Sequence, residues 1–424
     1  MEEKILIISY FFPPRPTTGA TRVKNIADFL SEKGITPIVV TGDWQKAHSD
    51  KIMAGGGNFD GSDNSLGYPV FYEKDEPTLR LRLYRLMEPP LLKKLYSVLV
   101  SPFLEILELQ FPSLIFYRNI YRKAVTLLEN NPSIKHVFIS MAPFNQAAFG
   151  YLLKKQFPHI NWVADYRDDW STSEVYTSST WLRMRTLQHY EKKYLSNCGS
   201  FCSVSEAYVN KIQQLIGKKG FLLANGFDDV VAQKAAAYNN ELFDDFTITF
   251  NGTLYNTQPV EFVLDGLLPL WEAGNSIYIK FIGTGADPSQ TDRIMRKVGR
   301  FSKYVEVTGR VSREIILDIQ LKSHLLLAIG HVGLQGVVGS KTYEYIGLKK
   351  KVLIAPTDND VIETLLTKTG QGYVCKSVEE CTASLNKVLL EYKSGTFQAM
   401  VDYKGYEEYS RKYMLNSLLK NLYS

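Results

Sequence analysis

The segment best suited to chemistry runs from Gly330 to Leu348 and reads GHVGLQGVVGSKTYEYIGL. A loop with four glycines follows an apolar strand and leads into a helix predicted to begin near Ser340. A helix start presents unpaired N–H groups and the positive end of the helix dipole, so it binds anions and phosphate above all. Lys341 adds a cation where the dipole disfavours one. Glu344 lies one turn further on the same face.

The alternative for Lys341 and Glu344 is an ordinary surface ion pair, which stabilises a helix by about 0.3 kcal/mol. Such a pair gives no reason for four glycines in the preceding loop. Two known phosphate motifs do not fit. A nucleoside-triphosphate P-loop needs glycine directly before the lysine, where this chain has Ser340, and a dinucleotide fingerprint starting at Gly283 lacks its third glycine because Pro288 stands there.

A second candidate is the charged sequence DYRDDW, residues 165–170, which follows another apolar strand. Three carboxylates and an arginine so close together are costly unless they are paired or used. We predict that Asp165, Arg167 and Asp168 orient or deprotonate a hydroxyl group. A structural Arg–Asp clamp is the alternative.

A third candidate is the start of the first helix, where Gly19 and Ala20 would let the backbone approach a ligand closely. Gly19 could equally serve only as a turn residue. Arg22 would oppose the helix dipole unless an anion were bound. None of the six histidines has metal-ligand spacing, and no serine or cysteine nucleophile motif is present, so no metal is expected.

These residues are carried by strands and helices that alternate along the chain. Ile5–Ser9, a helix over Thr21–Lys33 and Pro37–Thr41 form a βαβ unit. The pattern restarts near residue 225. Further strands are predicted at His136–Ser140, Asn161–Asp165, Gly199–Val204, Thr247–Phe250, Ile277–Ile282, Val305–Thr308, Leu325–Ile329 and Lys351–Ile354, and helices at 181–195 and Pro259–Leu268.

The pattern predicts an α/β protein with two doubly wound, Rossmann-like domains that face a central cleft. We place the domains at residues 1–200 and 201–395, with a helix in 396–424, near Tyr406–Leu422, crossing back to the first. Ligands of such sheets lie beyond the carboxyl ends of the strands. The loops expected to form the site are therefore 10–20, 140–145, 165–170, 251–257, 283–288, 309–312 and 330–341.

Composition is that of a globular protein without a nucleic-acid partner, because 49 basic and 44 acidic residues in 424 leave a net charge of only +5. The four cysteines are predicted to be buried free thiols in a reducing cytoplasm. The N-terminus lacks signal-peptide character, and the uncharged stretch Leu95–Leu104 is too short to span a bilayer. Residues 53–67, rich in glycine, are predicted to be a surface loop.

The net charge resides in one region, residues 79–123, which holds eight basic and three acidic residues. The same region is crowded with leucine, tyrosine, phenylalanine and proline. Basic and apolar side chains together favour a peripheral contact with an anionic membrane. An ordinary helical insertion with solvated charges is the alternative.

Several of these segments together resemble the GT-B fold glycosyltransferases, in particular the large retaining family 4 of bacterial surface-polysaccharide synthesis. The N-terminal KILIISYFFPP…TGATR resembles that family's opening strand, glycine–alanine loop and helix. FISMAPF and WVADYRDDW resemble S-x-P-P and A-D-[FY]-R-D-x-W segments of one branch. GSKTYEYIGLKKKVLIAP resembles K-x-[FY]-E-Y-[LI]-x-x-x-K-P-[IV]-L in the nucleotide-binding half.

The resemblance implies a role for residues of the second half. Lys341 would bind the donor diphosphate and Glu344 the ribose, with Ser340 and Thr342 beside them at the helix start. The family's other glutamate, seven residues ahead of its ribose-binding partner, would fall at Gly336, a departure from the pattern. The glycine turn with Gly252 and Thr253 lacks the cations common in the family, and the loop with Arg310 and Val311 would meet the base.

The resemblance therefore implies transfer of a sugar, with retention, from a UDP- or GDP-linked donor to a lipid-linked or glycan acceptor, without a further cofactor. Asp168 is our candidate for orienting the acceptor hydroxyl. The protein would act in the cytoplasm, or at the inner face of the cell membrane if residues 79–123 bind lipid. Two alternatives stay open: a nucleotide-sugar epimerase of the same fold, and a degenerate, non-catalytic GT-B subunit that scaffolds a partner.

Overall fold

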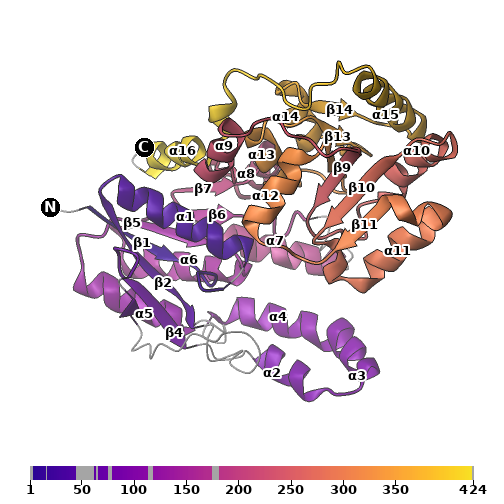
Figure 1. Cartoon of the computed structure of the whole chain (residues 1–424). Helices are drawn as coiled ribbons and strands as arrows, with labels where there is room; N and C mark the ends of the chain where they lie inside the picture. Colours follow the sequence, from indigo (N-terminus) through magenta and orange to yellow (C-terminus); the bar gives the residue numbers. More distant parts are fainter. Residues whose placement is uncertain are drawn as a thin grey trace. The chain divides into compact units, whose positions relative to one another are not determined.

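The computed structural model describes residues 3–15, 17–43, 62–63, 65–74, 79–112, 118–173 and 181–422. Most of the glycine-rich stretch 53–67, predicted as a surface loop, lies outside the described residues. The chain divides into two compact units, each with its own sheet (Figure 1). The first unit comprises residues 1–223 and 415–424, and the second comprises residues 224–414.

The first unit contains an eight-stranded sheet in the order β3-β4-β2-β1-β5-β6-β7-β8. Neighbouring strands are parallel, except that β3 runs antiparallel to β4. The central strands are nearly continuous apolar runs because helices cover both faces of a parallel sheet. The strands are β1 Glu3–Ile8, β2 Ile35–Asp43, β3 Ser62–Asp63, β4 Val70–Lys74, β5 His136–Ser140, β6 Asn161–Tyr166, β7 Ser200–Ser203 and β8 Gly220–Leu222.

Helices of the first unit connect these strands. The first begins after Thr17, whose hydroxyl accepts a hydrogen bond from the Ala20 N–H as an N-cap. The described helices are α1 Thr18–Glu32, α2 Leu79–Leu86, α3 Pro90–Leu95, the π-helical turn η1 Tyr96–Val100, α4 Ser101–Gln110, α5 Arg118–Asn130, the 3₁₀ turn η3 Phe144–Gln146, α6 Ala147–Gln156, α7 Trp181–Leu195 and α8 Glu206–Ile216.

The second unit contains a six-stranded, fully parallel sheet in the order β11-β10-β9-β12-β13-β14. From β9 the chain builds outward to β11 and then returns to place β12 on the other side of β9. The topological switch point, where ligands of open α/β sheets bind, therefore lies between β9 and β12. The strands are β9 Phe246–Asn251, β10 Ile277–Ile282, β11 Val305–Thr308, β12 Leu325–Ala328, β13 Val352–Ile354 and β14 Gly372–Val374.

The helices of the second unit alternate with these strands. They are α9 Asp229–Ala236, α10 Val260–Glu272, the 3₁₀ turn η4 Thr284–Ala286, α11 Pro288–Val298, the 3₁₀ turn η5 Gly299–Tyr304, α12 Arg313–Lys322, α13 Ser340–Gly347, α14 Val361–Lys368, α15 Val378–Lys393 and the 3₁₀ turn η6 Tyr406–Tyr409. All strands predicted from the sequence are present. The four cysteines are free and buried.

The division between the units lies at Leu223 and Ala224, not at the predicted 200/201. The physical reason is that β7 pairs with β6, and β8 with β7, so both strands complete the first sheet. The last helix, α16 (Arg411–Leu422), returns the chain to the first unit at Leu415.

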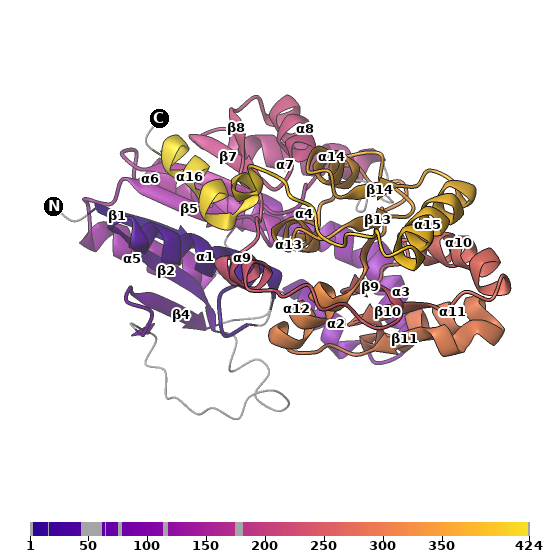
Figure 2. The same ribbon diagram turned by 45° about the horizontal axis from the view of Figure 1, so that its top comes forward.

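The second half of α16 is held by the first unit (Figure 2). Its Leu415, Leu418 and Leu422 belong to the same apolar core as strand β1 and helix α1. The Ser417 hydroxyl donates to the Leu222 carbonyl of β8, 2.9 Å away. The segment 396–414, predicted to belong with the returning helix, lies in the second unit.

A buried ion pair joins α1 to β6 in the first unit. Arg22 Nε lies 3.1 Å and 3.2 Å from the two Asp165 carboxylate oxygens, and Nη2 lies 2.7 Å from one of them. Nη2 also donates to the Leu223 carbonyl at 2.9 Å. Burial lowers the pKa of Arg22, but Asp165 and Cys202 together raise it by more, so the net pKa lies above the ordinary value. Arg22 therefore needs no bound anion to explain its place in α1.

We predict that Arg22→Met destabilises the protein by about 3–5 kcal/mol, because it leaves the fully buried Asp165 carboxylate without its cation. The measurement is urea-induced unfolding. The matched control is Lys24→Met on the same helix, whose partner Asp28 is one-third exposed, and it should cost at most about 0.5 kcal/mol. Equal losses in the two variants would contradict the structural role of Arg22.

Candidate functional site

The loop after β12 leads directly into α13, which begins at Ser340 as predicted. The N-cap residue Gly339 has no side chain to bond the first-turn N–H groups. This helix start therefore keeps donors for an outside acceptor, and its dipole favours an anion. Lys341 stands in the first turn with its side chain 38% exposed, whereas Thr342 is buried.

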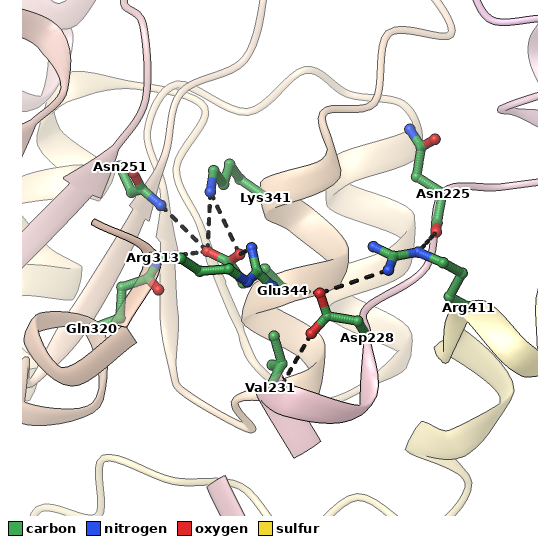
Figure 3. A network of polar contacts seen from close by, with 9 residues as sticks. All are labelled: Asn225, Asp228, Val231, Asn251, Arg313, Gln320, Lys341, Glu344 and Arg411. Atoms are coloured by element: carbon green, nitrogen blue, oxygen red, sulfur yellow. Dashed lines mark hydrogen bonds and ion pairs between the residues drawn. The ribbon is translucent and has the colours of Figure 1, made fainter. Parts of the chain in front are cut away.

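Glu344, one turn into α13, is the centre of a polar network (Figure 3). Its side chain is only 6% exposed. Oε1 accepts hydrogen bonds from Asn251 Nδ2 at 3.3 Å and from Gln320 Nε2 at 3.0 Å. Lys341 Nζ lies 3.3 Å and 3.4 Å from the two carboxylate oxygens. The carboxylate thus joins the end of β9, helix α12 and the start of α13.

Arg313 extends the network toward α9. Its Nη1 lies 3.3 Å from Glu344 Oε2, and its Nη2 lies 2.7 Å from Asp228 Oδ2 (Figure 3). Asp228 is also the N-cap of α9, accepting from the Val231 N–H at 3.2 Å, and lies 3.6 Å from Arg411. Three cations and two carboxylates make up this network, so it carries one excess positive charge.

The loops after β9 and β12 are tied together at the switch point. Gln258 Nε2 donates to the Ile329 carbonyl at 2.8 Å, and the Val332 N–H donates to the Thr257 carbonyl at 2.8 Å. Thr257 Oγ1 and His331 Nδ1 are hydrogen-bonded at 2.8 Å. Burial lowers the pKa of His331, with Asp358 opposing this effect, so the imidazole is neutral at pH 7.

The predicted glycine turn after β9 has the backbone that only glycine adopts readily. Gly252 has φ +136°, and its carbonyl accepts from Thr284 Oγ1 at 3.1 Å. Thr253 next to it is exposed. Arg310 and Val311, in the loop after β11, are exposed as well. The arginine that reaches the Glu344 network is Arg313 and not Arg310.

Gly336 also has a left-handed backbone, with φ +80°. Its N–H donates to Asp360 Oδ2 at 2.5 Å. A glutamate at this position would be strained, because side-chain-bearing residues rarely adopt such φ values. The backbone conformation at residue 336 therefore favours glycine over the glutamate that the resemblance would place there.

In the first unit, Gly19 and Arg167 lie against each other although they are far apart in the chain. A Cβ added to Gly19 would fall 1.4 Å from Arg167 Nη1, so only glycine leaves room for the guanidinium. Arg167 lies 5.3 Å and Arg15 lies 4.2 Å from the ring centre of Phe11. The group that approaches the start of α1 closely is thus an arginine of this chain. Ala20 is buried beside Gly19.

The DYRDDW carboxylates have three different environments. Asp165 is fully buried, and both of its oxygens accept from Arg22, which is the arrangement of the Arg–Asp clamp given as the alternative. Asp169 is buried in its own loop, and burial raises its pKa against the opposing effect of Lys211. Only Asp168 is exposed, and Arg167 is half-buried next to it.

The structure thus brings together Ser340, Lys341, Thr342 and Glu344 on α13, and Gly19, Ala20 and Arg167 at the start of α1. It adds residues that sequence reasoning missed: Asn251, Gln320, Arg313, Asp228 and His331. For Asn251, Arg313, Asp228 and His331 the only signal was a position at or after a strand end, and Gln320, inside α12, had none. Among the described residues, no three His, Cys, Asp or Glu side chains are grouped to hold a metal ion.

Comparison with known proteins finds likeness in structure alone. No family model matches the sequence, and no curated protein does. A glycosyltransferase from Rickettsia africae matches with a TM-score of 0.64 at 12% identity, over 99% of this chain and 98% of that one. HepE of Anabaena, solved with UDP-glucose, matches with a TM-score of 0.60 at 11% identity over 99% of both chains.

A UDP-GlcNAc 2-epimerase from Neisseria meningitidis, bound to UDP-GlcNAc, also matches, with a TM-score of 0.52 at 12% identity over 99% of both chains. At such identities the likeness shows the fold. The chain has the GT-B fold of two Rossmann-like α/β units, which confirms the predicted fold class.

We predict that Glu344→Leu destabilises the second unit by about 2–4 kcal/mol, because Gln320 and Asn251 lose their acceptor in a buried place. The partly exposed Lys341 and Arg313 add less, since water screens their charges. Thermal unfolding measures the loss. The control is Glu306→Leu, half-exposed on β11 and paired with Lys280, which should cost less than about 1 kcal/mol. A loss no larger than that of the control would show that Glu344 does not organise the site.

Proposed function

We propose that the protein is a retaining glycosyltransferase of surface-polysaccharide, lipopolysaccharide or capsule synthesis. It would transfer a sugar from a UDP- or GDP-linked donor to a lipid-linked or glycan acceptor. One observation carries the proposal: the uncapped start of α13, with Lys341 in its first turn, lies after the switch-point strand β12. The GT-B neighbour HepE, solved with UDP-glucose, supports a nucleotide-sugar donor.

The donor diphosphate is proposed to bind at the start of α13. Breaking the glycosyl–phosphate bond leaves a nucleoside diphosphate with growing negative charge. The unpaired N–H groups of the first turn, beginning at Ser340, and the Lys341 ammonium are fixed before the reaction, so they stabilise that charge at little reorganisation cost. The excess positive charge of the Glu344 network acts in the same direction. The proposal uses no cofactor beyond the donor itself.

Lys341 and Glu344 are proposed to exchange partners when the donor binds. The Lys341 contacts to Glu344, at 3.3 Å and 3.4 Å, are long for charge-assisted hydrogen bonds. Lys341 is also partly exposed, so its ammonium can turn to the phosphate. Glu344 keeps Asn251, Gln320 and Arg313, and the position that Lys341 leaves accepts a ribose hydroxyl. Gly252 and Thr253, and Arg310 with Val311, are proposed to line the donor and the base.

On the acceptor side, Asp168 is proposed to orient the attacking hydroxyl, because it is the exposed carboxylate of the DYRDDW segment. The departing phosphate can take the hydroxyl proton, so no second protein base is needed. Arg167, held against Gly19, would place a cation at the same loop. Asp165 supports this loop indirectly through its clamp with Arg22.

The second candidate function is a nucleotide-sugar epimerase, which the match to the Neisseria meningitidis enzyme keeps open. The transferase is favoured because the glycosyltransferase structures match with higher TM-scores. An epimerase would need acid and base groups at the sugar ring and would consume no acceptor.

We expect the protein to release nucleotide from one donor in a panel of UDP-, GDP- and ADP-sugars, and only when a detergent-extracted lipid acceptor is present. Coupled detection of the free nucleotide measures the release. An altered sugar without acceptor consumption would indicate the epimerase. No reaction with any donor, together with retained nucleotide binding, would indicate a non-catalytic subunit.

We predict that Lys341→Ala weakens nucleoside-diphosphate binding about ten- to a hundredfold, the effect of losing one charged hydrogen bond to the diphosphate. Isothermal titration calorimetry with UDP and with GDP measures this affinity. The matched control is Lys387→Ala, at an exposed position of α15, which should bind as tightly as the wild type. Unchanged affinity in Lys341→Ala would place the diphosphate elsewhere.

A further inference from the structure

The exposed apolar side chains of this protein gather on one part of the first unit. The described residues include twenty exposed large apolar side chains. Eleven of them lie between Leu79 and Phe111, on or beside helices α2 to α4, and two more are Trp181 and Leu182 at the start of α7. Figure 1 shows α2, α3 and α4 as a helical layer of their own. An apolar patch of this kind marks an interaction surface.

The apolar residues form a stripe along one helical run. The helices α3, η1 and α4 follow one another without a break from Pro90 to Gln110. The exposed side chains recur every three or four residues, so they share one face of the run. They are Leu91, Leu92, Leu95, Val98, Leu99 and Phe103, with exposures between 46% and 69%.

The opposite face of this run is fixed to the protein. Tyr96 is buried, and its hydroxyl donates to the Arg80 carbonyl at 2.7 Å. The hydroxyl of Tyr194 on α7 donates to the carbonyl of the buried Leu109. Arg183 of α7 lies 2.5 Å from Glu105. Turning the stripe inward would break all these contacts, so its exposure is a property of the fold.

Basic side chains flank the stripe, while the acids of α4 face inward. Glu105 pairs with Arg183 and Arg80, and Glu108 lies 3.7 Å from Arg80 and is buried. In contrast, Arg85 and Lys94 are exposed, as is one acid of this region, Glu88. The Arg185 guanidinium lies 4.5 Å from the ring centre of the exposed Trp181, a pairing of tryptophan with a cation that suits a membrane–water interface.

We propose that this α3–α4 face, formed by the stripe with Trp181, Leu182 and the flanking basic residues, lies on an anionic lipid bilayer. The leucine, valine and phenylalanine side chains would enter the boundary between headgroups and acyl chains, and Arg85, Lys94 and Arg185 would meet lipid phosphates. No helix in the described part of the chain has the length and apolarity to cross a bilayer, so the contact is interfacial. The inference goes beyond the proposed reaction, because it rests on the surface of the first unit alone.

A second copy of the chain is the less favourable occupant. Two such faces brought together would place their cations against each other, whereas an anionic surface neutralises them. The face also differs from the predicted region 79–123. Arg80 is engaged with Glu105 and Glu108, and Lys123 of α5 lies over the Phe71 ring of β4 at 4.2 Å.

The test is co-sedimentation of the full chain with vesicles of phosphatidylcholine that contain 30% phosphatidylglycerol, a composition of roughly natural anionic charge. We expect the wild type to bind and to lose affinity as salt is raised. Leu99→Ser/Phe103→Ser and, separately, Arg85→Gln/Lys94→Gln should each bind about tenfold more weakly. On vesicles of pure phosphatidylcholine, Arg85→Gln/Lys94→Gln should lose less affinity relative to the wild type than it loses on the anionic vesicles.

The matched control is Leu390→Ser/Lys387→Gln on α15 of the second unit, an equivalent loss of exposed apolar and basic groups, which should bind vesicles like the wild type. Wild-type binding that the two face variants do not weaken would overturn the proposal, and so would absence of wild-type binding. A dimer in sedimentation velocity, abolished by Leu99→Ser/Phe103→Ser, would assign the face to a second copy instead. UDP binding without lipid should be unchanged in all variants, so the proposed transferase and this face can fail separately.

Discussion

The organisation of the second unit depends on one buried carboxylate, Glu344. A carboxylate removed from water must be compensated by several donors. Glu344 obtains them from β9, α12 and α13 through Asn251, Gln320, Arg313 and Lys341. The same interactions that satisfy its charge fix the start of α13 against the end of β9, one of the two strands at the switch point. Glu344 therefore positions the helix start at which we propose that the donor diphosphate binds.

In the first unit, the buried carboxylate of Asp165 is compensated by Arg22. The pair is buried and engages the first carboxylate of the DYRDDW segment, whereas Asp168, three residues later, faces solvent. In both units a buried ionic group lies at the carboxyl end of an interior strand, β6 in the first unit and β9 in the second. A buried charge is costly to leave unpaired, so the pairing restricts how the adjacent loop can be placed.

The fold could largely be predicted from the sequence, because buried parallel strands are near-continuous apolar runs. The strands β3, β4, β8 and β14 were not predicted; β3 has only two residues, and β8 and β14 have three residues each, one of them a glycine. The start of α13 at Ser340 was predictable from the glycine loop before it. The partners of Glu344 were not, because Arg313 and Asn251 are 31 and 93 residues away and only the tertiary fold brings them near. Likewise, the sequence shows that Gly19 is small but not that Arg167 fills the space beside it.

The surface charge is a second property that the sequence alone predicts only in part. Residues 79–123 hold eight basic residues, which a count treats as equivalent. In the structure Arg80 neutralises the acids of α4, Lys123 covers an aromatic ring of β4, and Arg85 and Lys94 face water. Because paired charges are already compensated, only the outward cations can attract an anionic partner over a distance of about one Debye length. The pairing of α4 with Arg80 and Arg183 thus leaves Arg85 and Lys94 exposed in the region of the apolar stripe, against one exposed acid, Glu88, which a charge count alone does not reveal.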